Sequence, residues 1–325
     1  AASRMKLIRP GRRFPIARRL LLPLCLLLLA ADSEDDEYSC SGSTGLVRAS
    51  QTKIRIAYGA GEFVAVGENT TIASSTDGAS FGTWNQELAT DALMAIAIGP
   101  NGWIAAGEHG LEATSADARA WTTTALPTGQ ALRGAAFGAE RWALVGGHGR
   151  ILGSDDGVAW GMLESHTERA LHDVVFGVDR FVAVGDRGTV TTSPDGLEWT
   201  RRRTGTTENL RGVGFGDGLF VAVGEGGSIL TSVDGVVWTS ESSPVVSTLR
   251  DVAFGSSSFV AVGEGGIVLS SVDARTWVVR SLPVNRSRAD WTGVAHGGGL
   301  FVVVGDPYIG YTTDTVRSND GVTWF

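Results

Sequence analysis

The sequence has few cysteines, no apolar run of membrane-spanning length and, past its first residues, almost no lysine. Only Cys25 and Cys40 occur among the 325 residues, and Lys53 is the only lysine after residue 31. Cys25 lies in a short apolar run that we interpret as a removable signal. The remaining segment then has one cysteine and no internal disulfide. A domain of about 280 residues can instead be stabilised by its hydrophobic core.

The first 31 residues combine a basic head with a short apolar run. They contain seven basic residues and no acidic one, and residues 20–31 read LLLPLCLLLLAA. Twelve residues are too few for a membrane-spanning helix, which needs roughly 20. A basic head, a short apolar run and small residues such as Ala30 and Ala31 are typical of a secretory signal. We expect residues 1–31 to be a signal peptide and the protein to be exported, to the periplasm or the cell exterior. The alternative is an uncleaved anchor that keeps the protein at the membrane.

The composition changes at residue 32. Residues 32–44 are acidic and then rich in Ser and Gly, which is typical of a solvated linker. Seven of the 27 basic residues and none of the 35 acidic residues precede Asp32, so the rest carries 20 basic against 35 acidic residues, a net charge near −15. Such a charge excludes general electrostatic binding to nucleic acid or to an anionic membrane surface.

The rest of the chain is a repeat of about 39 residues. Each copy has short runs rich in Val and Phe, separated by Gly and ending in a polar turn and an aromatic residue. The closing aromatic residues are Phe81, Trp121, Trp160, Trp199, Trp238, Trp277 and Trp324. Four short strands per copy at this period are the signature of propeller blades. We therefore predict an all-β, seven-bladed β-propeller of four-stranded blades over residues 45–325.

The polar turn recurs with the pattern Ser-x-Asp-Gly-x-x-Trp, and we refer to it as the Asp turn. Its aspartates are Asp77, Asp117, Asp156, Asp195, Asp234, Asp273 and Asp320. We expect each Asp to accept hydrogen bonds from the backbone N–H groups one and two residues further on, and the Gly to take a positive φ. Because the Asp recurs in every copy, it indicates a structural role and not a catalytic one.

The sequence also predicts how the ring closes. The seventh copy reaches Trp324 and Phe325 without a fourth strand of its own. We predict that residues 45–50, GLVRAS, provide that strand and thus close the propeller from its N-terminal side.

The repeat resembles a known group of propellers. The Asp turn is similar to a shortened BNR-type Asp-box, and the whole repeat, with Val-Gly-x-x-Gly-x-Ile before the turn, resembles the photosystem II assembly and stability factor family. This resemblance covers residues 50–325. It implies a seven-bladed, non-catalytic propeller that helps to assemble membrane protein complexes on the extracytoplasmic side. We accordingly expect a monomer with a protein partner and without a cofactor or metal.

The alternative is a glycan-binding or glycan-cleaving propeller. Sialidases resemble this chain in fold and Asp-boxes, but they also need three arginines, a Tyr/Glu pair, an acid/base Asp and an early Arg-Ile-Pro. No Arg-Ile-Pro occurs, and Tyr58 takes a strand position held by Phe in other copies, which indicates a core residue. We therefore expect a protein that is not an enzyme, with the glycan alternative left open.

A polar ring is predicted at one mouth of the central channel. The turn between the second and third strands is acidic in six copies, and the first strands begin on the same face with arginines. The residues that we expect to bind a partner there are Glu68, Glu108, Asp186, Glu225, Glu264, Asp306, Arg133, Arg211 and Arg250. The alternative is that these charges only pair locally on an exposed surface, where such pairs contribute little.

The seventh copy departs most from the repeat. Its turn between the second and third strands is five residues longer than in the sixth copy and contains Tyr308 and Tyr311. Exposed Tyr in a long loop is a residue type that dominates binding interfaces, so we add both to the candidate partner site. The alternative is that this copy is distorted because it closes the ring. We interpret Arg201, Arg202 and Arg203 as a solvated outer face.

Overall fold

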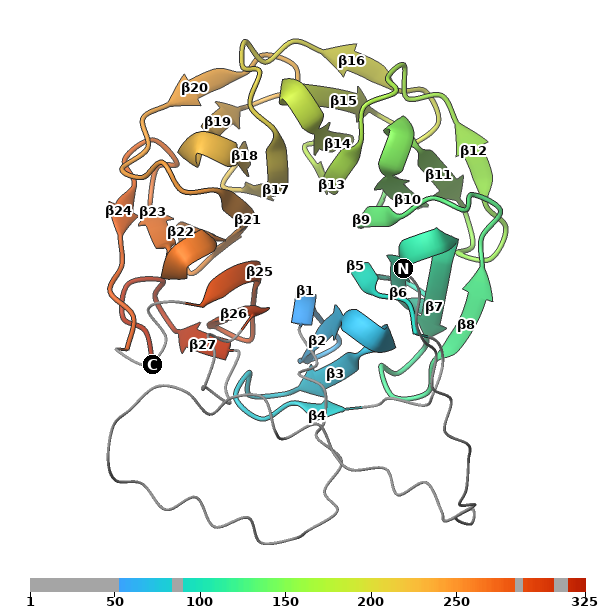
Figure 1. The fold of residues 1–325 in the computed structure, drawn as a ribbon, viewed down its shortest axis with the longest axis horizontal. Helices are drawn as coiled ribbons and strands as arrows, with labels where there is room; N and C mark the ends of the chain where they lie inside the picture. Colours follow the sequence, from blue (N-terminus) through green and yellow to red (C-terminus); the bar gives the residue numbers. More distant parts are fainter. Residues whose placement is uncertain (1–52, 84–89, 284–288, 307–314) are drawn as a thin grey trace, which may run out of the picture. The chain divides into compact units, whose positions relative to one another are not determined.

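A computed structural model of the chain describes residues 53–83, 90–283, 289–306 and 315–325. The predicted signal peptide, linker and closing strand all lie outside these residues, as do Tyr308 and Tyr311. The described residues form seven antiparallel sheets arranged in a ring, with the first strand of each sheet innermost (Figure 1). The prediction of a seven-bladed, all-β propeller is confirmed.

The strands of every blade follow each other in chain order, from the channel to the rim. The first strands are β1 (Lys53–Gly59), β5 (Leu93–Gly99), β9 (Leu132–Gly138), β13 (Leu171–Gly177), β17 (Leu210–Gly216), β21 (Leu249–Gly255) and β25 (Asp290–Gly297). The second strands are β2 (Glu62–Gly67), β6 (Gly102–Gly107), β10 (Arg141–Gly146), β14 (Arg180–Gly185), β18 (Leu219–Gly224), β22 (Ser258–Gly263) and β26 (Leu300–Asp306).

The two outer strands of each blade are shorter. The third strands are β3 (Ile72–Ser75), β7 (Leu111–Ser115), β11 (Ile151–Ser154), β15 (Thr189–Ser193), β19 (Ile229–Ser232), β23 (Val268–Ser271) and β27 (Thr315–Ser318). The fourth strands are β4 (Gly82–Thr83), β8 (Thr122–Ala125), β12 (Gly161–Leu163), β16 (Thr200–Arg202), β20 (Thr239–Glu241) and β24 (Val278–Val279).

Six sheets therefore have four described strands, and the seventh has three. In the seventh sheet Phe325 exchanges two backbone hydrogen bonds of 3.0 Å with Arg317 of β27. In the sixth blade the equivalent pair is Ser270 with Val278, the first residue of β24. Phe325 thus occupies the first position of a fourth strand, so the chain begins this strand itself.

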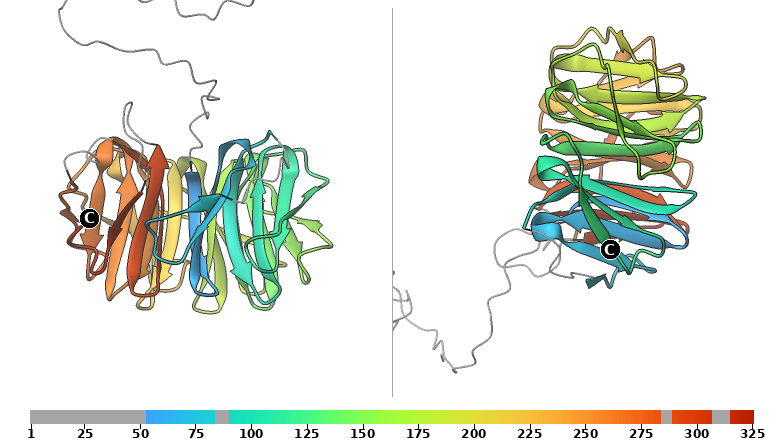
Figure 2. Two further views of the ribbon diagram at one scale, coloured as in Figure 1. Left: turned by 90° about the horizontal axis from the view of Figure 1, so that it is seen from below. Right: turned by 90° about the vertical axis from the view of Figure 1, so that its right-hand side faces the viewer.

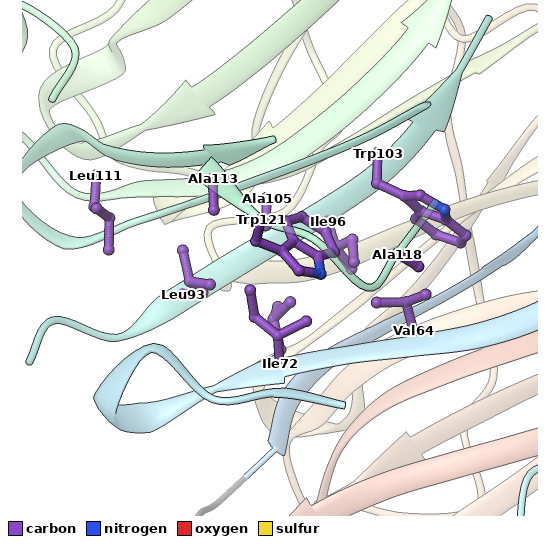
Figure 3. Close-up of a cluster of buried hydrophobic side chains, with 11 residues drawn as sticks. Val64, Ile72, Leu93, Ile96, Trp103, Ala105, Leu111, Ala113, Ala118 and Trp121 are labelled. Atoms are coloured by element: carbon purple, nitrogen blue, oxygen red, sulfur yellow. The ribbon is translucent and has the colours of Figure 1, made fainter. Parts of the chain in front are cut away.

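The hydrophobic core lies between neighbouring blades. Each blade contributes alternate residues of its inner strands to the contact on either side, as expected for a sheet that is covered on both faces. Between the first two blades, Val64 and Ile72 from one sheet meet Ile96, Trp103 and Trp121 from the next (Figure 3). One sheet alone would leave both faces exposed, so the stability of each blade depends on its neighbours.

A second contact joins the blades around the channel. Each first strand ends in a Gly. This Gly packs against the side chain that precedes the terminal Gly of the first strand in the next blade. A Cβ on Gly216 would lie 2.0 Å from Cγ of Phe254, and one on Gly297 of the last blade would lie 1.9 Å from the ring of Tyr58 in the first. Tyr58 also packs against Phe63, at 4.8 Å between ring centroids. It is therefore part of the core that joins the last blade to the first.

The seven Asp turns have one common geometry. In each, the Oδ1 atom accepts the hydroxyl of the Ser two residues earlier and the backbone N–H groups two and three residues further on. The predicted bond from the N–H two residues further on is confirmed in every turn, whereas the second backbone donor lies three residues further on and not one. The positive φ at the next position is confirmed, and Ala118 and Ala274 adopt it where Gly is absent.

The two faces of the ring carry different connections (Figure 2). The Asp turns lie on one face. On the other face, in each of the first six blades, a single turn of 3₁₀ helix follows the second strand: η1 (Glu68–Thr70), η2 (Glu108–Gly110), η3 (Gly147–Gly149), η4 (Asp186–Gly188), η5 (Glu225–Gly227) and η6 (Glu264–Gly266). We refer to the latter as the upper face. Among the described residues no helix has the length and apolarity to cross a membrane.

Candidate functional site

The predicted polar ring assembles on the upper face. Backbone bonds tie its 3₁₀ turns to the segments that lead into first strands, such as Glu225 N–H to the Asn209 carbonyl at 2.9 Å and Gly188 N–H to the Glu208 carbonyl at 2.7 Å. The side chains of Arg133, Arg211 and Arg250 therefore meet around a cavity of about 190 Å³ at the channel opening. We call this cavity the channel mouth.

Two arginines of the ring are paired with a glutamate of their own blade. Arg250 Nη2 lies 2.8 Å from Glu264 Oε1, and Arg211 forms an ion pair with Glu225. The bond from Arg211 is the largest cause that holds the pKa of Glu225 below its ordinary value. The local pairing that we considered as the alternative is therefore present in these two blades.

In the fourth blade a histidine replaces the arginine. His172 Nε2 lies 2.7 Å from Asp186 Oδ1 and 3.0 Å from Arg211 Nη1. Burial is the largest cause that lowers the pKa of His172, so the imidazole is neutral at pH 7. A neutral ring that donates Nε2–H to Asp186 leaves no lone pair on that atom for Arg211. Arg211 donates to Glu225 through its other terminal nitrogen, Nη2.

Arg133 is the exception in the ring. Its blade has Gly147 where six blades have an acidic residue. Within the described part of the chain Arg133 makes no ion pair, and its buried Nε–H has no hydrogen-bond acceptor. Arg133 also lines the inner cavity of Asp173 and Asp251, described below, but forms no ion pair with either of them.

The other predicted ring residues lie further from the opening. Glu68 is exposed on η1, and Glu108 Oε2 accepts the backbone N–H of Ala92 at 3.1 Å. Asp306 ends β26, and nothing beyond that backbone position is described. Neither Glu68 nor Glu108 lines the channel mouth.

A charged cluster that the sequence analysis missed lies below the mouth. Arg55 donates to the carbonyl oxygens of Thr292 at 3.0 Å and Arg211 at 3.4 Å, and it lies 3.6 Å from Asp251 Oδ2. Asp251 and Asp173 line the same inner cavity of about 110 Å³. Other blades have Ala or Gly at this position of the first strand, as in Gly212. A charged residue at a position where other blades have a small one is the sequence signal that could have revealed this cluster.

The half-buried Asp173 and the buried Asp251 also hold neighbouring blades together. Asp173 accepts the N–H of Val213 in the next blade at 3.0 Å, and Asp251 accepts that of Val294 at 2.9 Å. Burial is the main cause that raises the pKa of both carboxyls, for Asp173 to about 7, and Arg55 opposes this. Their oxygens already have backbone partners, which is the arrangement of a structural group.

A second feature of the upper face is a groove at the rim of the fourth blade, with a volume of about 600 Å³. Its walls include the arginines Arg169, Arg187, Arg201, Arg202 and Arg203, and we call it the arginine groove. Among the described residues none of the five forms an ion pair; Arg202 Nε donates to Thr192 at 2.9 Å and Arg169 to the Arg187 carbonyl at 3.3 Å. The run 201–203 is visible in the sequence, but its convergence with Arg169 and Arg187 is not, because these two residues lie on different turns.

Metal ligands do not cluster in the described residues. No group there brings three or more His, Cys, Asp or Glu side chains together in a way that could hold a metal ion. His109 lies 3.4 Å from Asp91, and both are partly exposed.

Comparisons with known proteins agree on the fold. No family model matches the chain, and no curated protein matches it. A solved structure of YCF48 bound to D1 peptide is 18% identical, with a TM-score of 0.64, over 80% of this chain and 92% of that one. YCF48 from Cyanidioschyzon merolae is 16% identical, with a TM-score of 0.55, over 72% of this chain and 84% of that one.

An enzyme has a similar fold as well. Virginiamycin B lyase from Staphylococcus aureus, solved with selenomethionine, is 11% identical to this chain. The TM-score is 0.71, over 84% of this chain and 96% of the lyase. At such identities the likeness concerns the propeller fold, which serves binding proteins and enzymes alike.

Proposed function

We propose that this protein is an exported, non-catalytic propeller that binds an acidic segment of a protein partner and so acts in the assembly of an envelope complex. The arginine groove is the observation that carries this proposal. Five arginines converge there without an internal counter-charge, in a domain whose net charge is near −15. Guanidinium groups pair with carboxylates through two parallel hydrogen bonds, so an acidic peptide suits such a groove.

The groove and the channel mouth form one path on the upper face. Arg187 N–H donates to the side chain of Asn209 at 2.8 Å, and the amide of Asn209 donates to Glu225 at 2.9 Å. Glu225 in turn pairs with Arg211 at the mouth. We propose that an extended segment that begins in the groove follows this line to the channel mouth, where Arg133 forms no ion pair in the described part of the chain. The partner-binding role of the polar ring is thus part of the proposal, with Arg133 as its main cation.

The similarity to YCF48 bound to D1 peptide supports a peptide ligand, since that propeller has the same architecture and binds a peptide. A catalytic role has less support. The carboxylates of Asp173 and Asp251 each accept hydrogen bonds from two backbone N–H groups. The carboxylates of the Asp turns likewise bond to the backbone, so all of these groups have structural partners. A glycosidase needs two carboxyl groups about 5–10 Å apart in a substrate-sized cleft.

The test compares two pairs of substitutions that remove equal charge. The first pair is Arg201→Ser with Arg203→Ser, in the groove. The control pair is Arg275→Ser with Arg280→Ser in the sixth blade, where Arg280 bonds to Ser270 as Arg202 bonds to Thr192. Binding of a fluorescent Asp/Glu-rich peptide and of its Asn/Gln counterpart would be measured by anisotropy with the full chain.

We expect the acidic peptide to bind more tightly than its neutral counterpart, with an affinity that falls as salt rises. The groove pair should weaken binding by about tenfold, which is a loss of about 1.4 kcal/mol. The control pair should leave it unchanged. Equal affinity for both peptides, or equal loss in both pairs, would contradict the proposal.

A further inference from the structure

One blade lacks a side chain that the others use to fill the space between blades. In several blades the residue that starts the second strand packs under the Asp turn of the following blade. A Cβ on Gly196 would meet Arg141 at 2.9 Å, and a Cβ on Gly235 would meet Arg180 at 3.2 Å. The second blade has Gly102 at this position, with a φ of +115°. A Cβ there would lie 2.3 Å from the Ser115 carbonyl, so the backbone itself excludes a side chain.

The missing side chain leaves a cavity between the second and third blades. It has a volume of about 290 Å³, and Gly102 and the turn glycine Gly157 both line it. Ligand pockets begin at roughly this size. The cavity lies on the face of the Asp turns, away from the arginine groove, so it is independent of the proposed peptide site.

The walls of this cavity contain two indole rings that the repeat does not require. The second residue of the second strand is Phe in five blades and Trp only at Trp103 and Trp142. Both tryptophans line the cavity. Trp103 is 2% exposed and Trp142 is 1% exposed, so both indole rings belong to the packed core and border the cavity with only a small part of their surface.

The polar groups at the cavity are hydroxyls, an amide and one carboxylate. They come from Thr114, Thr122, Asn101 and Asp156. Asp156 uses Oδ1 for its three turn bonds, and its Oδ2 has no partner in the described chain. The turn N–H groups of Ala159 and Val158 are the main causes that lower the pKa of Asp156, so the carboxyl stays ionised. The cavity thus offers a carboxylate acceptor and hydroxyl and amide side chains that serve as donors or acceptors.

These features select the ligand by size and chemistry. A cavity of about 150 Å³ is known to hold benzene, so this one has room for a six-membered ring with substituents. Val158, which is 80% exposed, and the accessible parts of the indoles provide apolar contact for the ring carbons, and the surrounding groups can bond to several hydroxyls. We propose that the cavity between the second and third blades is a binding site for one neutral pyranose residue.

The experiment uses the full chain and simple probes. Methyl glucopyranosides and galactopyranosides would be titrated by saturation-transfer NMR and calorimetry, with choline as a cationic probe of matched size. Thr122→Phe, at the start of β8, places a ring in the cavity. Thr239→Phe is the matched control, because Thr239 is the equivalent exposed residue of β20 and does not line this cavity. Asn101→Ala removes the amide from an exposed turn without adding bulk.

We expect at least one pyranoside to bind the wild-type chain. Thr122→Phe and Asn101→Ala should each weaken binding by about tenfold, a loss of about 1.4 kcal/mol. Thr239→Phe should bind like wild type. The proposal is overturned if no pyranoside binds, if Thr122→Phe and Asn101→Ala both bind like wild type, or if choline binds in preference to the sugars. Melting temperatures identify a variant that fails to fold, and Asn101→Ala then decides the matter alone.

Discussion

The aspartates of the Asp turns show how one carboxylate can hold a whole hairpin. Asp234 accepts the N–H groups of Val236 at 2.8 Å and Val237 at 2.9 Å and the hydroxyl of Ser232 at 3.0 Å. The bond from Val237 is the largest cause that lowers the pKa of Asp234. The folded chain therefore holds this carboxylate more firmly than the unfolded chain does. Its contribution to stability is present above the ordinary pKa of 3.8 and is lost as the pH falls below it.

We predict that Asp234→Ala lowers the free energy of unfolding by about 1–2 kcal/mol at pH 7, because three hydrogen bonds to a charged acceptor are lost. The difference from wild type should shrink as the pH falls from about 4 toward 2, where the wild-type carboxylate also gains a proton. Urea unfolding at several pH values measures both effects. Glu164→Ala, an exposed residue outside any turn motif, is the control, and a loss of equal size there would contradict the prediction.

Glu112 is a buried acid where other blades have an aliphatic residue such as Ile72 or Val268. It is 4% exposed, and its Oε1 accepts the indole N–H of Trp160 at 2.9 Å. Burial is the main cause that raises the pKa of Glu112 to about 7. Since the folded chain keeps a proton that the unfolded chain releases near pH 4.5, stability should fall as the pH rises from 4.5 to 7.

Glu112→Gln should remove this pH dependence while keeping an acceptor for Trp160. We predict that the stability of the variant relative to wild type rises by on the order of 2 kcal/mol between pH 4 and pH 8. Thermal unfolding at both pH values tests this. Glu164→Gln serves as the exposed control, and a pH-independent difference for Glu112→Gln would show that burial does not control this carboxyl.

At the scale of the strand, the contact between the terminal Gly of one first strand and the aromatic ring of the next determines how closely neighbouring blades approach. Because a Cβ on Gly216 would lie 2.0 Å from Phe254, any side chain there forces the first strands apart. Gly161 on an outer strand is a useful contrast, since a Cβ there would meet only one atom, the Gly153 carbonyl oxygen at 4.0 Å.

Gly216→Ala should therefore destabilise the chain by about 1–3 kcal/mol through overpacking. Gly161→Ala should change stability by less than about 0.5 kcal/mol, as expected of most surface substitutions. Chemical denaturation of both variants makes the comparison. Similar losses would mean that the backbone freedom of glycine, and not the contact with Phe254, decides the effect.

The sequence predicts the elements well because their cause is local. Alternating apolar residues and Gly at the ends define the strands, and the repeat fixes their number, so the seven blades and the turn Gly with positive φ could be predicted. Contacts that depend on neighbouring blades could not. The pairing of Arg250 with Glu264 depends on which side chains face the mouth. The arginine groove is formed by three segments that are separate in the sequence. The role of Gly102 depends on the neighbouring residues that surround it in the fold, so the sequence does not distinguish it from other strand glycines.

At the scale of the whole molecule, the charged cluster in the channel joins blades that are distant in sequence. Arg55 comes from the first blade and contacts backbone or side chains of the fifth, sixth and seventh. It is the cation nearest to Asp173 and Asp251, and its charge lowers their pKa values against the effect of burial.

Arg55→Met should leave both aspartates without this cation. We predict a loss of about 3 kcal/mol at pH 8, typical of breaking a buried ion pair. The loss should be smaller at pH 5, where the raised pKa values allow the carboxyls to be protonated and neutral. In a chain that already carries Asp173→Asn and Asp251→Asn, the same substitution should cost much less. An equal cost in both backgrounds would assign the effect of Arg55 to its backbone contacts alone.

The seven Asp turns also give the ring an electrical orientation. All seven carboxylates stay ionised well below neutral pH and lie together on one face, whereas the arginine groove opens on the other. Both faces nevertheless carry charges of both signs, because Glu68 and Glu225 lie on upper-face turns and Arg119 lies beside the turn of Asp117. The attraction for an anionic chain is therefore local to the arginine groove, and salt limits its range to about 10 Å. The Asp turns strengthen this contrast because they place their own negative charges on the face away from the groove.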